Sequence, residues 1–353
     1  MTLRKILLID FNVFYGGGEV YLVNLLQLLH GKAKFYALCV NPGLAERMRQ
    51  LDVHVFSFVP TVKWGKYVHT LIGMAGILFM RIRFRVDTVW VQGVPEVAFL
   101  PFARMLGCTS IATRHCTFEP SISRTLYPFF AACANKIICV SKVVADDLAD
   151  IVSSTRLVVI SNWIPLLPDP LEIQEAEGRP IRLLFVGRLE RYKGLYLILD
   201  AMRRFKLNGS NRAVSLTVVG EGEYRKELER QAGGLDVRFA GFQKDASEFY
   251  RIADVFINPS LGPEGLPLVS LEAMSYGLPC IFSDLPVHKE ITDDGRCALL
   301  FRSGDALDLS LNIQMFLSSE ETRKQYKNAS RDVIVNRYSA EVAYGNYVRE
   351  LRL

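Results

Sequence analysis

Short apolar runs alternate with amphipathic segments along most of the chain. Uninterrupted apolar runs of this length, bounded by glycine, proline or polar residues, are typical of strands buried on both faces of a parallel sheet. They predict strands over residues 5–10, 35–40, 53–58, 88–92, 110–114, 137–141 and 157–160, then over 181–186, 215–219, 237–240, 255–258 and 280–282. Helical spacing between these runs completes repeated strand–helix–strand units, so the pattern predicts an α/β protein with open sheets.

The alternation stops once, over residues 165–180, where four prolines and several acidic residues leave no helical face. Such a stretch is typical of a linker between domains. Because 353 residues suit two domains of ordinary size, we predict an N-terminal domain over residues 1–165, a linker over 166–180 and a C-terminal domain over 181–335. The tail from residue 319 is expected to be mostly helical.

Composition narrows the class of protein. Half of the residues are hydrophobic and 22% are charged, which excludes global disorder. The seven cysteines include no C-x-x-C pair and are odd in number, which indicates reduced thiols in a cytoplasmic setting, with neither a disulfide framework nor a zinc site. The first apolar run is too short for a signal peptide, and no run is long enough to span a membrane.

Charge is uneven along the chain. Residues 1–165 carry 17 Lys/Arg and 10 Asp/Glu, whereas the remainder carries 25 and 27. A basic first half favours an anionic partner such as a membrane surface, or it is an ordinary solvated face. Residues 64–84 are expected to form a long apolar helix that ends in arginines, either an interfacial helix meeting anionic lipid or a core helix. We favour the core helix, with its basic and aromatic flank, Trp64, Lys66 and Tyr67, at a membrane edge. Nucleic-acid binding is disfavoured because no arginine and aromatic stripe accompanies the basic residues.

The chemistry concentrates in residues 256–283. There a buried strand leads through a loop into a helix, with Glu264 in the loop and Glu272 inside the helix. The amides of Gly265, Leu266 and Leu268 lie at the expected helix start, where unpaired N–H groups and the helix dipole attract an anion. A diphosphate flanked by hydroxyl-bearing sugars suits an anion site with a carboxylate on either side.

This stretch resembles the signature of the family-four retaining glycosyltransferases of the GT-B fold, with two glutamates eight residues apart. The alternative is that Glu264, in the loop, and Glu272, in the helix, have no common function. A second matching stretch follows the strand over 181–186, where Gly187, Arg188 and Lys193 occupy a strand-to-helix loop. Cations there are placed to bind a diphosphate, or else are surface cations paired with Glu190.

The first half resembles the family more loosely. Gly17, Gly18 and Glu19 are similar to the family's glycine-rich entry, which lies near the donor phosphates, although a flexible turn explains them too. His115 follows a strand, where the family places a histidine near the donor sugar; a structural histidine is the alternative. By the same resemblance Phe242 flanks the nucleotide base, and the last helix, about 336–353, packs back on the first domain.

The resemblance implies two doubly wound Rossmann-like domains that face each other across a cleft. It implies retaining, metal-independent transfer of a hexosyl group from a nucleotide-sugar to an acceptor glycan or lipid-linked sugar, in surface-polysaccharide or glycolipid synthesis at the inner face of the membrane. Arg188, Lys193 and the amides then stabilise the leaving diphosphate, Glu264 holds the sugar, Glu272 holds the ribose and His115 lines the sugar. No cofactor or metal is expected. A nucleotide-sugar epimerase and a non-catalytic nucleotide-sugar or membrane-binding module remain alternatives.

Overall fold

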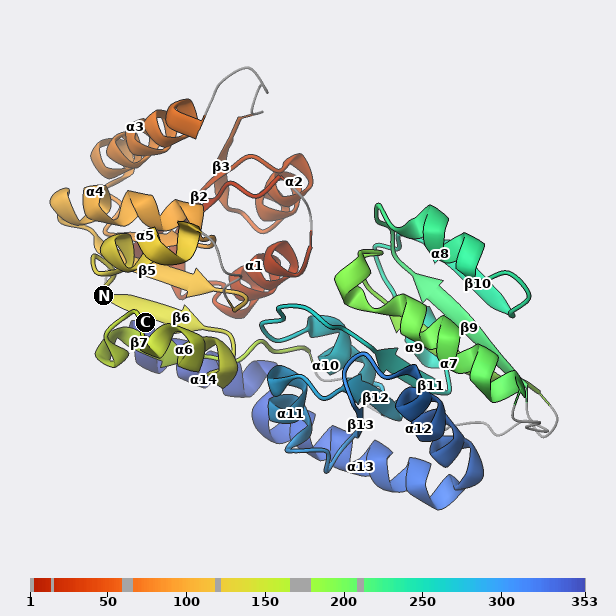
Figure 1. Ribbon diagram of the computed structural model, residues 1–353. Coiled ribbons are helices and arrows are strands. Elements are labelled where there is room, and N and C mark those ends of the chain that lie inside the picture. Colours follow the sequence, from red (N-terminus) through yellow and green to blue (C-terminus); the bar gives the residue numbers. More distant parts are fainter. Residues whose placement is uncertain are drawn as a thin grey trace. The chain divides into compact units, whose positions relative to one another are not determined.

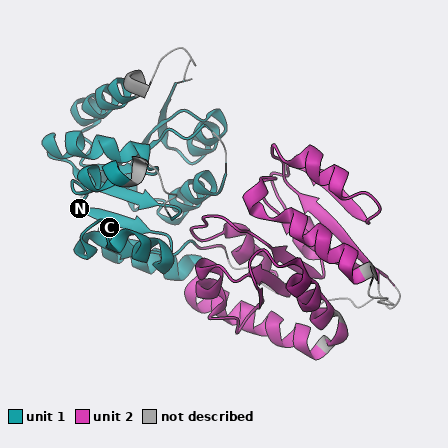
Figure 2. Ribbon diagram, in the orientation of Figure 1, with its two compact units in different colours: residues 1–162, 340–353 teal, residues 163–339 magenta. Residues whose placement is uncertain are grey.

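Figure 1 shows the computed structural model, which describes residues 3–13, 16–58, 66–117, 122–165, 179–207 and 213–352. The chain divides into two compact units (Figure 2). The first comprises Met1–Asn162 with Ala340–Leu353, and the second comprises Trp163–Ser339. Most of the predicted linker, residues 166–178, lies outside the described residues, as do Trp64 and the side chains of Lys66 and Tyr67.

The first unit is built on a parallel sheet of seven described strands in the order β3-β2-β1-β4-β5-β6-β7. Their bounds are β1 Arg4–Asp10, β2 Ala33–Cys39, β3 His54–Ser57, β4 Thr88–Val91, β5 Thr109–Arg114, β6 Lys136–Cys139 and β7 Leu157–Val159. The central strands β1, β4 and β6 bury nearly all their side chains, as strands covered on both faces must.

Helices of the first unit connect these parallel strands (Figure 1). They are α1 Gly17–Leu28, α2 Pro42–Gln50, α3 Lys66–Phe84, η1 Pro95–Phe99, α4 Leu100–Met105, α5 Ile122–Ala131, α6 Lys142–Ala149, η2 Ser154–Arg156 and α14 Ala340–Leu351. The C-terminal helix α14 is part of this unit: the Tyr347 and Tyr21 hydroxyls lie 2.5 Å apart, and Lys136 pairs with Glu350 at 2.7 Å.

The second unit repeats the architecture with a six-stranded parallel sheet in the order β10-β9-β8-β11-β12-β13. Its strands are β8 Ile181–Val186, β9 Val214–Val219, β10 Val237–Gly241, β11 Val255–Asn258, β12 Cys280–Ser283 and β13 Leu299–Phe301. Its helices are η3 Arg191–Lys193, α7 Leu195–Leu207, α8 Arg225–Gln231, α9 Ser247–Ile252, α10 Leu268–Ser275, α11 Pro286–Thr292, α12 Ala306–Ser318 and α13 Glu320–Arg337. The predicted α/β class with two doubly wound parallel sheets is therefore confirmed.

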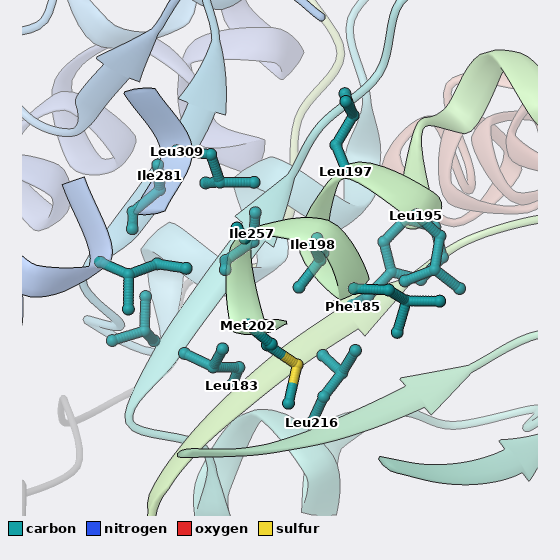
Figure 3. Packing of buried hydrophobic residues seen from close by; sticks show 14 of the residues in the cluster. Leu183, Phe185, Leu195, Leu197, Ile198, Met202, Leu216, Ile257, Ile281 and Leu309 are labelled. Carbon is teal, nitrogen blue, oxygen red and sulfur yellow. The ribbon is translucent and has the colours of Figure 1, made fainter. Parts of the chain in front are cut away.

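The core of the second unit lies between its sheet and the helices α7 and α12 (Figure 3). Ile198 and Met202 of α7 are buried against Leu183 of β8 and Leu216 of β9. Burial of apolar area on this scale is the main stabilising contribution to such a domain. It holds rigid the strand ends from which the loops described below emerge.

Three local predictions were incomplete or wrong. The strand β13 was not predicted, because its three residues are too short a run to stand out. Gly265 and Leu266, whose amides were expected at the helix start, precede α10, which begins at Leu268. The helix α3 was favoured as a core helix, yet only part of it is buried: Ile77 and Met80 face the core, while Leu71 and Ile82 are exposed.

Candidate functional site

The order of the strands places two loops of the second unit side by side. Strand order reverses between β8 and β11, which pair directly and run parallel. The loops that leave the carboxyl ends of two such strands diverge to opposite faces of the sheet, and ligands of open α/β folds bind there. The loop after β8 contains Arg188 and Lys193, and the loop after β11 contains Glu264.

Backbone packing joins these two loops. Gly194 adopts a left-handed conformation, with φ of 70°, and a Cβ atom there would lie 2.1 Å from the carbonyl oxygen of Pro259. The amide of Leu261 donates to the Tyr192 carbonyl at 2.7 Å. A glycine is therefore required at position 194, because only an unsubstituted Cα allows both the turn and the close approach.

Lys193 and Glu264 meet across the two loops. Lys193 Nζ lies 2.6 Å from Glu264 Oε1, and their side chains are only 18% and 9% exposed. Burial by itself raises the pKa of Glu264, but the Lys193 ammonium outweighs it and holds that pKa below its usual value. The result is an ionised carboxylate kept in a water-poor position by a partner 71 residues away in the sequence.

Arg188 lies beside this pair and is more accessible. Its guanidinium contacts Glu190 Oε1 at 2.8 Å and donates to the Tyr192 hydroxyl at 2.9 Å, with 55% of the side chain exposed. Lys193 Nζ is 5.3 Å from the centre of the same tyrosine ring. The structure thus gathers Arg188, Lys193 and Glu264 around Tyr192, which the sequence analysis did not single out, and it also contains the Arg188–Glu190 pair that the sequence left open.

The helix α10 follows Glu264 directly. Its first amides, those of Leu268 and Val269, have no acceptor one turn earlier, because the helix begins at Leu268. Glu272, in the second turn, accepts a hydrogen bond from the Tyr250 hydroxyl at 2.9 Å. Burial raises the pKa of Glu272 above its usual value, with a small opposing effect from that hydrogen bond.

Phe242 is 60% exposed and immediately follows β10. The charge of Asp245, three residues further along the chain, helps raise the pKa of Glu272, so the loop after β10 lies near Glu272.

His288, at the start of α11, was missed by the sequence analysis. It is fully buried, and its Nδ1 lies 2.9 Å from the Ser283 carbonyl oxygen and 3.1 Å from the Ser283 hydroxyl, which itself donates to the Ser260 carbonyl. Desolvation lowers the pKa of His288 to about 4, although the neighbouring Glu264 acts in the opposite sense. The ring is therefore neutral and helps hold the end of β12 against the loop that contains Glu264.

The first unit has an equivalent switch point between β1 and β4. Three buried carboxylates gather after these strands: Asp10, Glu19 and Glu96 are 6%, 1% and 5% exposed. Glu96 accepts from the Phe11 amide at 3.1 Å, and Asp10 accepts from the Asn12 amide at 2.8 Å. Asp10 and Glu96 come from strand ends 86 residues apart and were not predicted as site residues.

The glycine-rich entry lies at this switch point. Gly17 and Gly18 open α1, and Glu19 accepts from the Gly16 amide at 2.6 Å, which caps the helix with a side chain from its own first turn. A Cβ at Gly18 would lie 4.0 Å from Cδ2 of His115, so the structure brings these two predicted residues together. His115 Nε2 is 3.3 Å from Gln92 Oε1. Desolvation, with a contribution from the charge of the adjacent Arg114, lowers the pKa of His115 to about 4, so the ring is a neutral hydrogen-bonding group.

The carboxylate cluster predicts a pH-dependent stability. Burial, together with the charges of Glu19 and Glu96 and against the hydrogen bond from the Asn12 amide, raises the pKa of Asp10 from 3.8 to about 7. The folded chain therefore keeps this proton at pH values where the unfolded chain has lost it. The stabilisation is complete below pH 3.8 and disappears as the pH rises through 7. We expect Asp10→Asn to raise the melting temperature by about 5–15 °C at pH 8, consistent with roughly 2–4 kcal/mol, and by clearly less at pH 5, where only the part of the stabilisation lost between pH 3.8 and pH 5 is recovered.

Differential scanning fluorimetry at the two pH values tests this expectation. Asp52→Asn is the matched control, since Asp52 is exposed and its left-handed backbone suits asparagine. Equal effects of Asp10→Asn at pH 5 and pH 8 would contradict the assignment of a raised pKa to Asp10.

The described residues contain no group of three or more His, Cys, Asp or Glu side chains arranged to hold a metal ion. The carboxylates of Asp10, Glu19 and Glu96 in the first unit accept hydrogen bonds from backbone amides and from the Asn12 side chain.

Both halves of the chain match models of known families. The model described as Glycosyltransferase Family 4 matches residues 15–166, and the model described as Glycosyl transferases group 1 matches residues 171–333. The two matches meet close to the boundary between the compact units.

Curated relatives share part of the sequence. A phosphatidyl-myo-inositol mannosyltransferase of Mycobacterium leprae is 33% identical over 47% of this chain and 45% of its own length. The amylovoran biosynthesis glycosyltransferase AmsK of Erwinia amylovora is 28% identical over 49% and 45%, and the lipopolysaccharide core biosynthesis glycosyltransferase LpsE of Rhizobium meliloti is 26% identical over 61% and 63%. The matched part of the chain thus spans about half of each of the first two relatives and less than two thirds of the third.

Solved structures share the fold along nearly the whole chain. HepE of Anabaena, determined in complex with UDP, superposes with a TM-score of 0.84 at 17% identity and covers 99% of this chain and 100% of that chain. A glycosyltransferase from Rickettsia africae gives a TM-score of 0.82 at 17% identity and covers 100% and 98%.

Proposed function

The chain belongs to the family-four glycosyltransferases of the GT-B fold, and we propose that it transfers a hexosyl group from a nucleotide-sugar to an acceptor hydroxyl with retention of anomeric configuration. The observation that carries this proposal is the cluster of Lys193, Glu264 and Arg188 at the switch point of the second unit, directly before the N-terminus of α10. Cations, an ionised carboxylate and the backbone amides at and just before the start of α10 together suit a diphosphate joined to a sugar.

The proposed chemistry follows from where negative charge develops. As the sugar leaves, charge accumulates on the nucleoside diphosphate, and preorganised cations and amides lower the barrier most at that point. Lys193 and Arg188 supply the cations. The amides of Gly265, Leu266 and Leu268 donate hydrogen bonds to the diphosphate, and Gly187 allows the backbone to approach it. Glu264, already ionised, accepts from hydroxyls of the transferred sugar.

Other residues receive supporting roles in the proposal. Glu272 binds the ribose hydroxyls, and Phe242, exposed after β10, flanks the base. In the first unit, the neutral ring of His115 orients the sugar, and Gly17 and Gly18 allow close approach of phosphates. We propose no enzymic nucleophile and no metal: the leaving phosphate takes the acceptor proton as the new glycosidic bond forms on the same face.

The acceptor is proposed by class. The relatives are named for mannosylation of a phosphatidylinositol and for amylovoran and lipopolysaccharide synthesis. These names, with the basic first half of the chain, support a glycan or lipid-linked sugar in surface-polysaccharide or glycolipid synthesis, with the enzyme at the inner face of the membrane. No described helix is sufficiently long and apolar to cross a bilayer.

Donor binding is the first prediction of this proposal. We expect one nucleoside diphosphate, with UDP the first to test, and its sugars to stabilise the protein by about 2.7 kcal/mol at a hundredfold excess over the dissociation constant, because the ligand binds only the folded state. EDTA should not change the shift. The measurement is differential scanning fluorimetry against UDP, GDP, ADP and their common sugars. If no nucleotide shifts the melting temperature, the proposed donor site is wrong.

Product analysis separates the remaining alternatives. With donor and a polyprenyl-diphosphate sugar as acceptor, NMR of the product should show the anomeric configuration of the donor. A changed donor sugar without any acceptor would indicate an epimerase, and tight donor binding without turnover would indicate a binding module.

A further inference from the structure

One face of α3 is apolar and exposed. Its exposed apolar side chains recur at helical spacing between residues 71 and 82, and the edge strand β3 adds a phenylalanine beside them. We call this surface the α3–β3 face; its apolar members and their exposed fractions are Leu71 65%, Ile72 39%, Leu78 40%, Phe79 48% and Ile82 72% on α3, and Phe56 40% on β3.

The opposite face of α3 packs against the interior of the unit. Ile77 and Met80 are buried, and Gly73 and Gly76 come so close to Phe99 and Leu38 that a Cβ atom would lie 2.4 Å and 2.7 Å from their side chains. The exposed apolar residues are therefore not needed to attach the helix to its own unit. A contiguous exposed apolar surface of this kind marks an interaction site.

Aromatic contacts make the face continuous between helix and strand. The rings of Phe56 and Phe79 are 5.8 Å apart, and Phe84, at the end of α3, lies 6.0 Å from Phe79 and 6.1 Å from Phe56. β3 forms one edge of the seven-stranded sheet, and α3 lies next to it at the margin of the unit (Figure 1). The face is thus a ridge on the outside of the unit, away from the switch point between β1 and β4 in the strand order.

Positive charge surrounds the apolar ridge. Arg83 stacks over Phe84 at 5.2 Å, Arg85 is exposed directly after the helix, and Lys34 lies 5.8 Å from the Tyr36 ring that contacts Phe84. Residues 66–86 contain no Asp or Glu; the nearest acids along the chain are the half-buried Asp87 and, before β3, the exposed Asp52. Among the described residues no ion pair neutralises Arg83, Arg85 or Lys34.

We propose that the α3–β3 face docks onto an anionic lipid bilayer, with α3 lying in the plane of the interface. An apolar stripe several side chains wide enters the boundary between headgroups and acyl chains, while the flanking cations meet lipid phosphates. Charge disfavours a second copy as the occupant, since a two-fold contact through this face would bring two sets of arginines into one interface. The inference does not depend on the proposed transferase chemistry, because it concerns a different surface.

Vesicle flotation of the full chain tests the proposal. The wild-type protein should float with phosphatidylcholine vesicles containing 30% phosphatidylglycerol, but not with phosphatidylcholine alone, and added salt should weaken the binding. Leu78→Ser with Ile82→Ser should reduce the partition coefficient at least about tenfold, because two exposed side chains lose their burial in lipid. Arg83→Gln should reduce it by about fivefold.

The matched control is Leu311→Ser with Met315→Ser on α12, which changes two exposed side chains at the same helical spacing, 52% and 50% exposed, in the other unit. It should bind vesicles as the wild type does. Equal loss in both double variants, or undiminished flotation of the α3 variant, would overturn the proposal. So would a wild-type dimer that the α3 substitutions convert to a monomer while no vesicle binding is seen. Nucleotide-dependent melting shifts should be unchanged in both double variants, which keeps this test separate from that of donor binding.

Discussion

Replacing Lys193 by alanine is expected to lower kcat/KM at least a hundredfold and to destabilise the second unit. The substitution removes the ammonium 2.6 Å from Glu264 and leaves a carboxylate only 9% exposed without its partner. Loss of one member of a buried ion pair costs about 3–5 kcal/mol, because the remaining charge is desolvated and uncompensated. The pKa of Glu264 should then rise, since burial acts without the opposing Lys193 charge. The leaving diphosphate also loses a cation.

A second variant separates these two effects. Lys193→Ala with Glu264→Gln removes both charges, so urea unfolding should show most of the stability restored while kcat/KM stays low. Lys289→Ala is the control, since its pair with Asp284 spans 4.0 Å between half-exposed side chains and contributes little. Recovery of activity together with stability in the double variant would show that Lys193 acts only as the structural partner of Glu264.

Gly194→Ala is expected to destabilise the second unit by about 3 kcal/mol or more and to abolish the nucleotide-dependent melting shift. The new methyl group would overlap the Pro259 carbonyl, 2.1 Å from the Cβ position, and a non-glycine residue is strained at a φ of 70°. Relief requires the loops after β8 and β11 to separate, which also separates Lys193 from Glu264. Urea unfolding and fluorimetry with UDP measure the two consequences.

Gly304→Ala is the control that measures the destabilisation from backbone strain alone. Gly304 has a φ of 83° but no atom within 4 Å of its Cβ position, so alanine there meets strain without overlap. We expect about 1 kcal/mol of destabilisation and an unchanged nucleotide shift. If Gly194→Ala and Gly304→Ala change the free energy of unfolding and the nucleotide shift equally, then Gly194 is not required for the close approach of the two loops.

Much of the fold could be predicted from the sequence because parallel strands buried on both faces produce short apolar runs bounded by glycine, proline or polar residues. The strand Val255–Asn258 and the strand Ile181–Val186 were predicted at the residues where they occur. β13 was not, because Leu299–Phe301 is too short for its pattern to be distinguished from a loop. In α3 the periodicity identified a helix, but apolar residues on both faces carry no information about which face is covered.

The candidate site, too, was predicted in part from the sequence and in part revealed only by the tertiary structure. Residue type and local order identify Arg188, Lys193, Glu264 and Glu272 as loop and helix residues that follow buried strands, since glycine, proline and charge mark those positions in the chain itself. The pairing of Lys193 with Glu264, the buried tyrosine donor to Glu272 and the junction of Asp10 with Glu96 depend on contacts between distant segments. Local pattern cannot specify these contacts. They arise because parallel strands bring their carboxyl ends to one edge of a sheet, and because the ionisation of each group depends on the water and charge that packing leaves around it.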